Sequence, residues 1–292
     1  MHALSRSIRV LPILGISGFA ALCASTGFVP EIDMIVTAEH IGPGAVNLTP
    51  APGHPISCAL FDAGFIEAGD PMVNDNPPAA TDVRQALSSA LASRGYLTAA
   101  PSAPSLILVY SWGVIAREHT RGIDALANPN RHARLSVVAT SRQVAEIEGT
   151  VASSITPPQR NELTDLAGDR RYFVVVSAYD AASAGKREAR LLWRAKMSTR
   201  SIGAWMPEAM TALISGGATY FGADIESPLK IRSSALPVVA PAAKPASAAP
   251  GGPWDDDFIS ALVRHEHLLF SGERSPDPLR KGKYAGVSPS GF

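Results

Sequence analysis

The chain has 292 residues, of which 46% are hydrophobic and 18% are charged, so it holds enough apolar material for one or two globular domains. Basic and acidic residues number 26 each. This zero net charge argues against a nucleic-acid-binding protein, because such proteins need a clearly basic face.

Residues 1–25 have the pattern of an export signal. Arg6 and Arg9 precede an apolar run from Val10 to Ala24, and small residues follow at its end. Secretory signal peptides have this arrangement, and the run is shorter than the roughly 20 residues that a membrane-spanning helix needs. We therefore expect an exported protein, located in the periplasm or held at a membrane. Removal of the signal leaves 24 basic residues against 26 acidic ones.

The residue at which the signal ends decides whether the protein is anchored. If Cys23 becomes a lipid-modified first residue, the chain is tethered to a membrane; if cleavage follows Cys23, Ser25 or Gly27, the chain is released. Bacterial lipoprotein signals place a small residue before the cysteine, whereas Leu22 stands here, and the sequence leaves both outcomes open. The other cysteine, Cys58, lies in an apolar run and is expected to be a small buried side chain without a disulfide partner.

Four segments have the composition of β-strands, and they follow a Gly- and Pro-containing leader at 26–53. Ile56–Ile66 and Ser105–Arg117 flank a helical segment, so they are expected to be parallel and joined by a right-handed crossover. Tyr172–Asp180 and Ala189–Ser198 are expected to form an antiparallel hairpin. In the last strand Leu191, Trp193, Ala195 and Met197 alternate with Leu192, Arg194, Lys196 and Ser198. One face of that strand is therefore expected to be core and the other mostly water.

Two helices are expected to cover this sheet. Asp82–Arg94 carries apolar residues at helical spacing, with Asp82 and Gln85 in the positions of a capping box and Gly95 as the left-handed stop. Trp205–Ser215 has a wide apolar stripe, and Gly216-Gly217 is expected to end it. The predicted fold class is α+β: a mixed sheet of about four strands under two main helices, in a domain that spans residues 54–232.

Residues 118–171 form an insertion that is too long for a simple connection. A helix within it, Arg134–Glu148, is one interpretation of its pattern, and an extended segment at 135–139 is the other. The insertion is expected either to pack on the domain as a peripheral excursion or to bind a partner.

The composition changes after residue 232. Residues 233–253 are an Ala/Pro linker, residues 254–271 are a short amphipathic segment with acids at its N-terminal end, and residues 272–292 are expected to be disordered. The amphipathic segment is expected to dock either on its own domain or in a groove of a partner.

No motif for phosphate binding, serine hydrolysis, zinc peptidase activity or thiol redox chemistry occurs, so no catalytic residue, cofactor or metal is predicted. Three weak candidates remain. Asp62, Glu67 and Asp70 could act as paired carboxylates, and His265-Glu266-His267 could offer two imidazoles to a metal. An aromatic ligand face is the third candidate, formed by Tyr110, Trp112, Tyr179 and Trp193. The alternatives for these groups are turn residues, solvated tail residues and core aromatics.

Four short segments carry a resemblance to a known family. They are Arg94-Gly95-Tyr96, Leu106–Tyr110, Val174–Asp180 and Leu192-Trp193-Arg194. Together they resemble a family of uncharacterised bacterial exported proteins, many of them lipoproteins, in which a helix ends at Gly-aromatic, an apolar strand follows and an Asp-containing hairpin returns through Trp-Arg. The resemblance covers about residues 56–222. It implies an α+β envelope domain and brings no catalytic residues.

The leading functional hypothesis is a non-catalytic exported envelope protein that binds other envelope components through its insertion and tail. The alternatives are an exported hydrolase that uses Asp62, Glu67 or Asp70, and a small-ligand carrier with an apolar cavity between helix and sheet. A membrane contact is expected only through a lipid anchor at Cys23.

Overall fold

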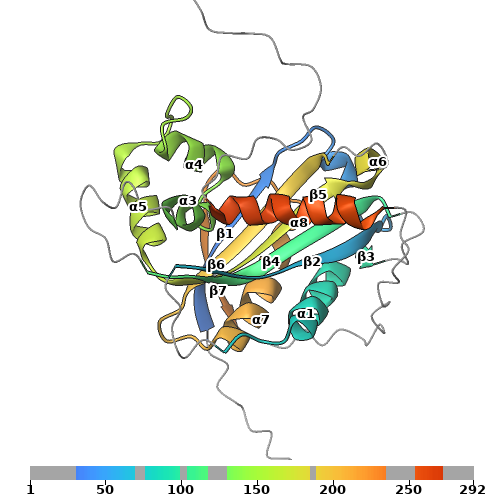
Figure 1. The fold of residues 1–292 in the computed structure, drawn as a ribbon, viewed down its shortest axis with the longest axis horizontal. Coiled ribbons are helices and arrows are strands. Elements are labelled where there is room, and N and C mark those ends of the chain that lie inside the picture. The colour runs from blue at the N-terminus through green and yellow to red at the C-terminus, as the bar shows by residue number, and fades with distance from the viewer. Residues whose placement is uncertain are drawn as a thin grey trace, which may run out of the picture.

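A computed structural model describes residues 31–69, 76–98, 104–117, 130–184, 189–234 and 254–271. The signal segment with Cys23, most of the Ala/Pro linker and the segment 272–292 lie outside these residues. The described part is a seven-stranded mixed sheet with helices on both faces (Figure 1). The strand order is β3-β2-β4-β5-β6-β1-β7.

The first three neighbours in this order are parallel and the remaining pairs are antiparallel. The strands are β1 (Glu31–His40), β2 (Ile56–Ala68), β3 (Tyr96–Thr98), β4 (Leu106–Ile115), β5 (Arg171–Asp180), β6 (Leu191–Arg200) and β7 (Leu229–Ser234). The parallel pairing of β2 with β4 and the antiparallel pairing of β5 with β6 are those that the sequence predicts.

The predicted sheet of about four strands under two helices is wrong, because the described residues contain seven strands and seven α-helices. The additional strands are β1, β3 and β7. β1 lies in the segment 26–53, for which the sequence analysis predicts no strand, and it pairs with both β6 and β7. β3 has only three residues, which is too short to show alternation of apolar and polar side chains. β7 has six residues and alternates over Leu229–Arg232, a signal that the sequence analysis does not use.

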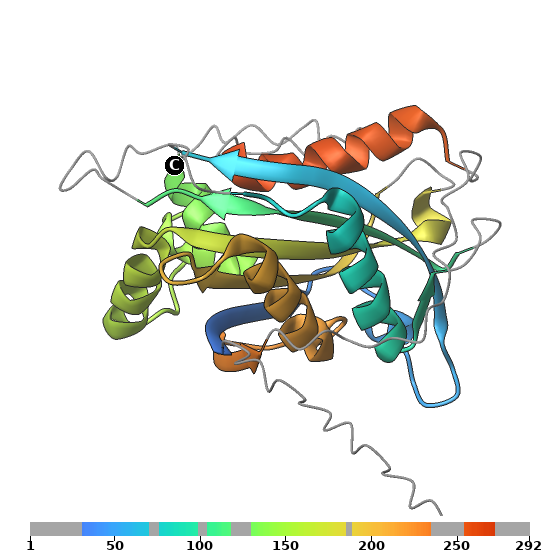
Figure 2. The same cartoon turned by 90° about the horizontal axis from the view of Figure 1, so that it is seen from below.

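Helices pack on both faces of the sheet (Figure 2). They are α1 (Ala80–Ser93), α3 (Asn130–Ser136), α4 (Ser141–Ile147), α5 (Pro157–Gly168), α6 (Ala181–Ala184), α7 (Met206–Gly217) and α8 (Asp256–Ser271), with two short 3-10 turns, η1 (Val46–Leu48) and η2 (Ala218–Tyr220). α1 and α7 pack on what we call the first face. α8 and the helices α3 to α5 pack on the opposite, second face.

The first face is an apolar core between the sheet and helices α1 and α7. α7 ends at Gly217, where the sequence predicts its end, but Gly216 and Gly217 are part of the helix and neither has the left-handed conformation of a stop. A Cβ atom added at Gly217 would collide with the side chain of Met197 in β6, and one at Gly216 would collide with Ser233 and Met34. The glycines therefore let α7 lie close to the sheet.

The start of α1 also differs from the prediction, while its end agrees with it. The helix begins at Ala80 after Ala79, which makes no side-chain cap, so Asp82 lies in the first turn and forms no capping box with Gln85. Gly95 follows the helix with a φ of 85°, the left-handed conformation expected of it.

The second face is not open to water, contrary to the prediction for the outer side chains of β6. Arg194, Lys196 and Ser198 are 3%, 3% and 0% exposed. The insertion covers them with α3, α4 and α5, where the sequence predicts at most one helix at 134–148. α8 covers the rest of this face, so the amphipathic segment docks on its own domain.

Candidate functional site

The middle of the second face carries a row of buried polar side chains. Ser177 of β5, Arg194 of β6 and Glu39 of β1 face one another across three neighbouring strands, and Lys196 lies two residues further along β6. All four residues are at most 9% exposed. Charges in such a place are stable only when they are paired and hydrogen-bonded.

Glu266 of α8 pairs with one of the two buried cations. It accepts hydrogen bonds from the Arg194 guanidinium at 3.2 Å, the Ser177 hydroxyl at 2.8 Å and the Tyr179 hydroxyl at 2.5 Å. Burial by itself would raise the pKa of Glu266, but Arg194 and the hydrogen bonds from His265 and Tyr179 outweigh it and lower that pKa to about 2. Glu266 is therefore a fully ionised anchor that holds α8 on the sheet.

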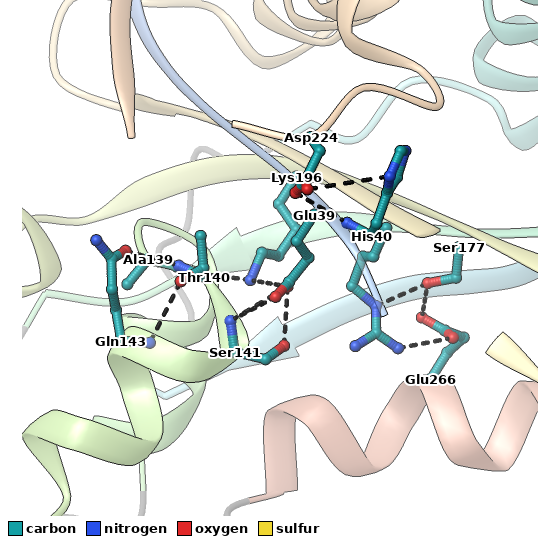
Figure 3. Close-up of polar contacts among 11 residues, drawn as sticks. Glu39, His40, Ala139, Thr140, Ser141, Gln143, Ser177, Lys196, Asp224 and Glu266 are labelled. Atoms are coloured by element: carbon teal, nitrogen blue, oxygen red, sulfur yellow. Dashed lines mark hydrogen bonds and ion pairs between the residues drawn. The ribbon is translucent and has the colours of Figure 1, made fainter. Parts of the chain in front are cut away.

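Glu39 pairs with the other cation and holds the first turn of α4 (Figure 3). Its carboxylate lies 3.3 Å from Lys196 Nζ and accepts hydrogen bonds from the Ser141 amide at 2.9 Å and the Ser141 hydroxyl at 2.8 Å. Lys196 also donates to the Ala139 carbonyl at 2.5 Å. Burial raises the pKa of Glu39, but Lys196 and Ser141 lower it by more, so its net shift is downward.

The N-terminus of α4 is fixed in addition by its own sequence. Thr140 accepts a hydrogen bond from the Gln143 amide, and the Gln143 side chain accepts one from the Thr140 amide, which together form a capping box. The pair of Glu39 and Lys196 thus ties the insertion to β1 and β6 through Ser141 and Ala139, and Glu266 ties the C-terminal helix to β5 and β6. Their carboxylates are fully engaged in holding these covers.

An open pocket of about 510 Å³ adjoins Glu39 and is lined by β1, α4 and the segment before β7. We call it the acidic pocket, because Asp224 and Glu226 lie exposed in its wall. His40 contacts Asp224 and lies 2.9 Å from the Gly222 carbonyl through Nε2. Carboxylates, amides and hydroxyls in such a wall suit hydroxyl groups and positive charges on a ligand.

The acidic pocket continues into two further pockets along β7. It shares Gln143, Gln159 and Ser227 with a narrow pocket of about 80 Å³, which we call the neck. The neck shares three residues, Ile35, Leu166 and Lys230, with a pocket of about 440 Å³ that we call the cationic pocket. Because neighbouring pockets share these residues, we describe the three together as one groove between α5 and the strands β1 and β7.

The structure does not bring Asp62 and Glu67, the two predicted carboxylates that it describes, close together. Asp62 accepts a hydrogen bond from the Gly64 amide at a bulge in β2, and Glu67 lies exposed further along this strand. Their partners in β4 are Tyr110 and Val114, four residues apart, which separates them by about 13 Å at the usual rise of a strand. Paired carboxylates of glycosidases lie about 5–9.5 Å apart. Asp70 is outside the described residues.

The other two candidates also have structural roles. His265 contacts the Tyr179 hydroxyl at 2.9 Å, His267 contacts the Ala63 carbonyl at 2.6 Å, and Glu266 lies between them in the ion pair with Arg194. No group of three or more potential ligands among the described residues could hold a metal ion. The four aromatic side chains are buried on different faces: Tyr110, Trp112 and Trp193 lie on the first, and Tyr179 lies on the second.

Neither Glu39 nor Glu266 is among the residues predicted to hold a cover. Glu39 lies in a strand that is not predicted, and Glu266 is predicted only as part of a histidine motif. One signal pointed to them: Arg194 and Lys196 alternate with core residues in a strongly apolar strand, and two cations there call for two buried carboxylates if that face is covered.

Comparison with known proteins leaves the family of this chain open. No protein-family model matches it, and no curated protein is significantly similar to it. Among solved structures, it is similar to the PelC dodecamer from Paraburkholderia phytofirmans, with 12% identity, a TM-score of 0.30, and coverage of 65% of this chain and 98% of that one. A PDZ domain protein from Parabacteroides distasonis has 11% identity and a TM-score of 0.36, with 70% and 40% covered. At TM-scores this low, the likenesses support no conclusion about function. No described helix has the length and apolar character needed to cross a membrane.

Proposed function

We propose that this chain is a non-catalytic exported protein of the cell envelope that binds another envelope component along the groove between α5 and β7. The export signal at residues 1–25 supports the location. The groove supports the binding role, because its three pockets share lining residues and run from an acidic to a cationic end.

The observation that carries this proposal is the way the groove is built. One wall comes from the insertion, through Gln143, Gln159 and Leu166, and the other comes from β1 and the segment that leads into β7. The ion pair of Glu39 with Lys196 and the hydrogen bonds to Ser141 fix the first wall against the second. A groove that is rigid before binding loses little conformational entropy when a ligand enters it.

The separation of Asp62 from Glu67 weighs against the hydrolase alternative. The three pockets open along an edge of the sheet, which fits an extended partner better than the closed apolar cavity that a small-ligand carrier requires.

The proposal is tested by crosslinking intact envelopes and purifying the chain with whatever is attached to it. Ser227 is exposed and lines both the acidic pocket and the neck, so Ser227→Trp blocks the groove without disturbing the core. The matched control is Ser93→Trp, at an exposed serine of α1 on the opposite face.

We expect a recurrent crosslinked component with the wild type and with Ser93→Trp, and its loss with Ser227→Trp. Retention of that component by Ser227→Trp would overturn the binding role of the groove. The mass of the processed N-terminus, measured in the same sample, decides between a lipid on Cys23 and release without a lipid.

A further inference from the structure

Four cationic side chains gather in the cationic pocket at the end of β5, β6 and β7. Arg171 lies directly opposite Arg200 on the neighbouring strand, and Lys230 and Arg232 line the pocket from β7. Like charges directly opposite each other in a sheet are destabilising unless something compensates them.

Three of these cations have a carboxylate partner. Arg200 pairs with Asp169 at 2.6 Å, Lys230 pairs with Glu162 at 2.6 Å, and Arg232 pairs with Asp33 at 3.1 Å. The cation of each of these pairs is exposed to water by more than half of its side chain. These surface pairs are weak and can exchange their partners.

The fourth cation, Arg171, is 2% exposed and has no carboxylate within ion-pair distance among the described residues. Its hydrogen bonds go to neutral acceptors: the Ser198 hydroxyl at 3.1 Å, the Ser198 carbonyl at 3.3 Å and the Leu166 carbonyl at 3.5 Å. Burial lowers the pKa of Arg171 to about 10, although Asp169 acts in the opposite sense. Arg171 remains charged at neutral pH, so the pocket carries one positive charge more than its carboxylates balance.

We propose that the cationic pocket binds an oxyanion group, a phosphate or a carboxylate, carried by the component that occupies the groove. This inference rests on the proposed function and names the chemistry at one end of the same groove.

The arrangement fits an oxyanion for two reasons. Guanidinium groups match the geometry of phosphate and carboxylate with two parallel hydrogen bonds, and the exposed Arg200 and Arg232 provide two such groups at one space of about 440 Å³. The buried Arg171 in the lining of this space adds the charge that no carboxylate balances. The pocket also opens into the neck past Ile35 and Leu166. An apolar chain attached to the anion can follow that path.

The test uses the purified processed chain, with the signal removed, at low ionic strength, where ionic contacts are least screened. The probes are inorganic phosphate, hexyl phosphate and sodium hexanoate, with hexanol as the uncharged control. We expect saturable binding of the three anions by calorimetry and none of hexanol. Tighter binding of hexyl phosphate than of inorganic phosphate would show that the apolar chain occupies the neck.

The variants are Arg232→Gln and Arg171→Gln, with Arg94→Gln as the control at an exposed arginine of the opposite face. Loss of one charge-assisted contact is expected to weaken phosphate binding about tenfold in Arg232→Gln. A larger loss is expected in Arg171→Gln, and no change in Arg94→Gln. If Arg171→Gln does not fold, Arg232→Gln and the comparison of the probes still decide the outcome.

Equal phosphate affinity in Arg232→Gln and Arg94→Gln, or no binding of any of the three anions, would overturn this inference. Different results test the proposed function. If no anion binds while Ser227→Trp still loses the crosslinked component, the binding role of the groove is supported and the oxyanion site is rejected. If anions bind as expected while Ser227→Trp retains the component, the oxyanion site is real and the component binds elsewhere.

Discussion

The two faces of the sheet are built from alternate residues of the same strands, yet different forces hold their covers. On the first face, α1 and α7 pack through apolar side chains such as Leu87, Leu213 and Trp193. On the second face, Glu266 holds α8 through its ion pair with Arg194, and the sheet pair of Glu39 and Lys196 holds the insertion through hydrogen bonds with Ser141 and Ala139. These groups form a polar row surrounded by apolar clusters.

The two kinds of contact contribute differently to the stability of the fold and to the placement of its covering helices. Apolar burial is strong but has no direction, so the first face needs shape complementarity to fix its helices. A buried ion pair adds little net stability, because removing its charges from water costs about as much as their attraction returns. It penalises every arrangement in which one charge lacks its partner. The second face therefore uses charge to specify where the insertion and the C-terminal helix dock.

The largest expected effect comes from breaking one buried pair on the second face. Glu266→Ala leaves Arg194 buried without a counter-charge and should lower the free energy of unfolding by about 3–5 kcal/mol in urea titrations. The matched control is Glu162→Ala, which breaks an exposed pair with Lys230 and should cost at most about 1 kcal/mol.

The double variant Glu266→Leu with Arg194→Met distinguishes positioning from net attraction. Because it removes both charges, it should be more stable than Glu266→Ala. A double variant that unfolds as easily as the single one would show that the pair itself supplies the stability of the second face.

A smaller effect is expected from a steric change on the first face. In Gly217→Ala the new methyl group meets Met197, and overpacking of this kind costs about 1–3 kcal/mol. Gly168→Ala is the control, since this last residue of α5 has open space around its Cβ position; it should be neutral or stabilising by up to about 1 kcal/mol. Equal thermal unfolding midpoints for the two variants would contradict the close approach of α7.

The smallest expected effect is the loss of folding stability at low pH. The pKa of Glu266 falls from its ordinary 4.5 to about 2 on folding, so its stabilising contribution is complete above pH 4.5 and is lost as the pH falls toward about 2. By about pH 3 the wild type should have lost roughly 1–2 kcal/mol through this group. Urea midpoints of Glu266→Gln should fall less steeply over the same interval. Gly217→Ala should keep the wild-type slope, and identical slopes in all three proteins would contradict the anchoring role of Glu266.

The sequence predicted those parts of the fold that have local signals. The continuous apolar run in Ser105–Arg117, the two β-rich runs of the hairpin and the helical spacing in Asp82–Arg94 gave strands and a helix close to those observed. β1 was missed although Met34, Val36 and Ala38 alternate in it, because the Gly and Pro residues around that segment suggested an irregular leader. α5 was missed because its apolar stripe is narrow, with Leu163 and Ala167 as its buried residues.

The candidate site could not be predicted from the sequence, and the reason is different. Arg194 and Lys196 have the pattern of a water-facing strand, and nothing local shows that residues 130–168 and 256–271 return to cover them. The groove likewise combines Gln143, Ser227 and Arg171, which belong to segments far apart in the chain.

By itself the sequence determined the parallel pair β2 and β4, the hairpin of β5 and β6, and the helices α1 and α7, because each follows from the pattern of neighbouring residues. Only the tertiary structure decided that the polar second face is buried, that Glu39 and Glu266 neutralise it, and that a groove runs beside it. The physical reason is that a side chain's polarity fixes its preferred environment locally, whereas its burial and its partner depend on which distant segment packs against it.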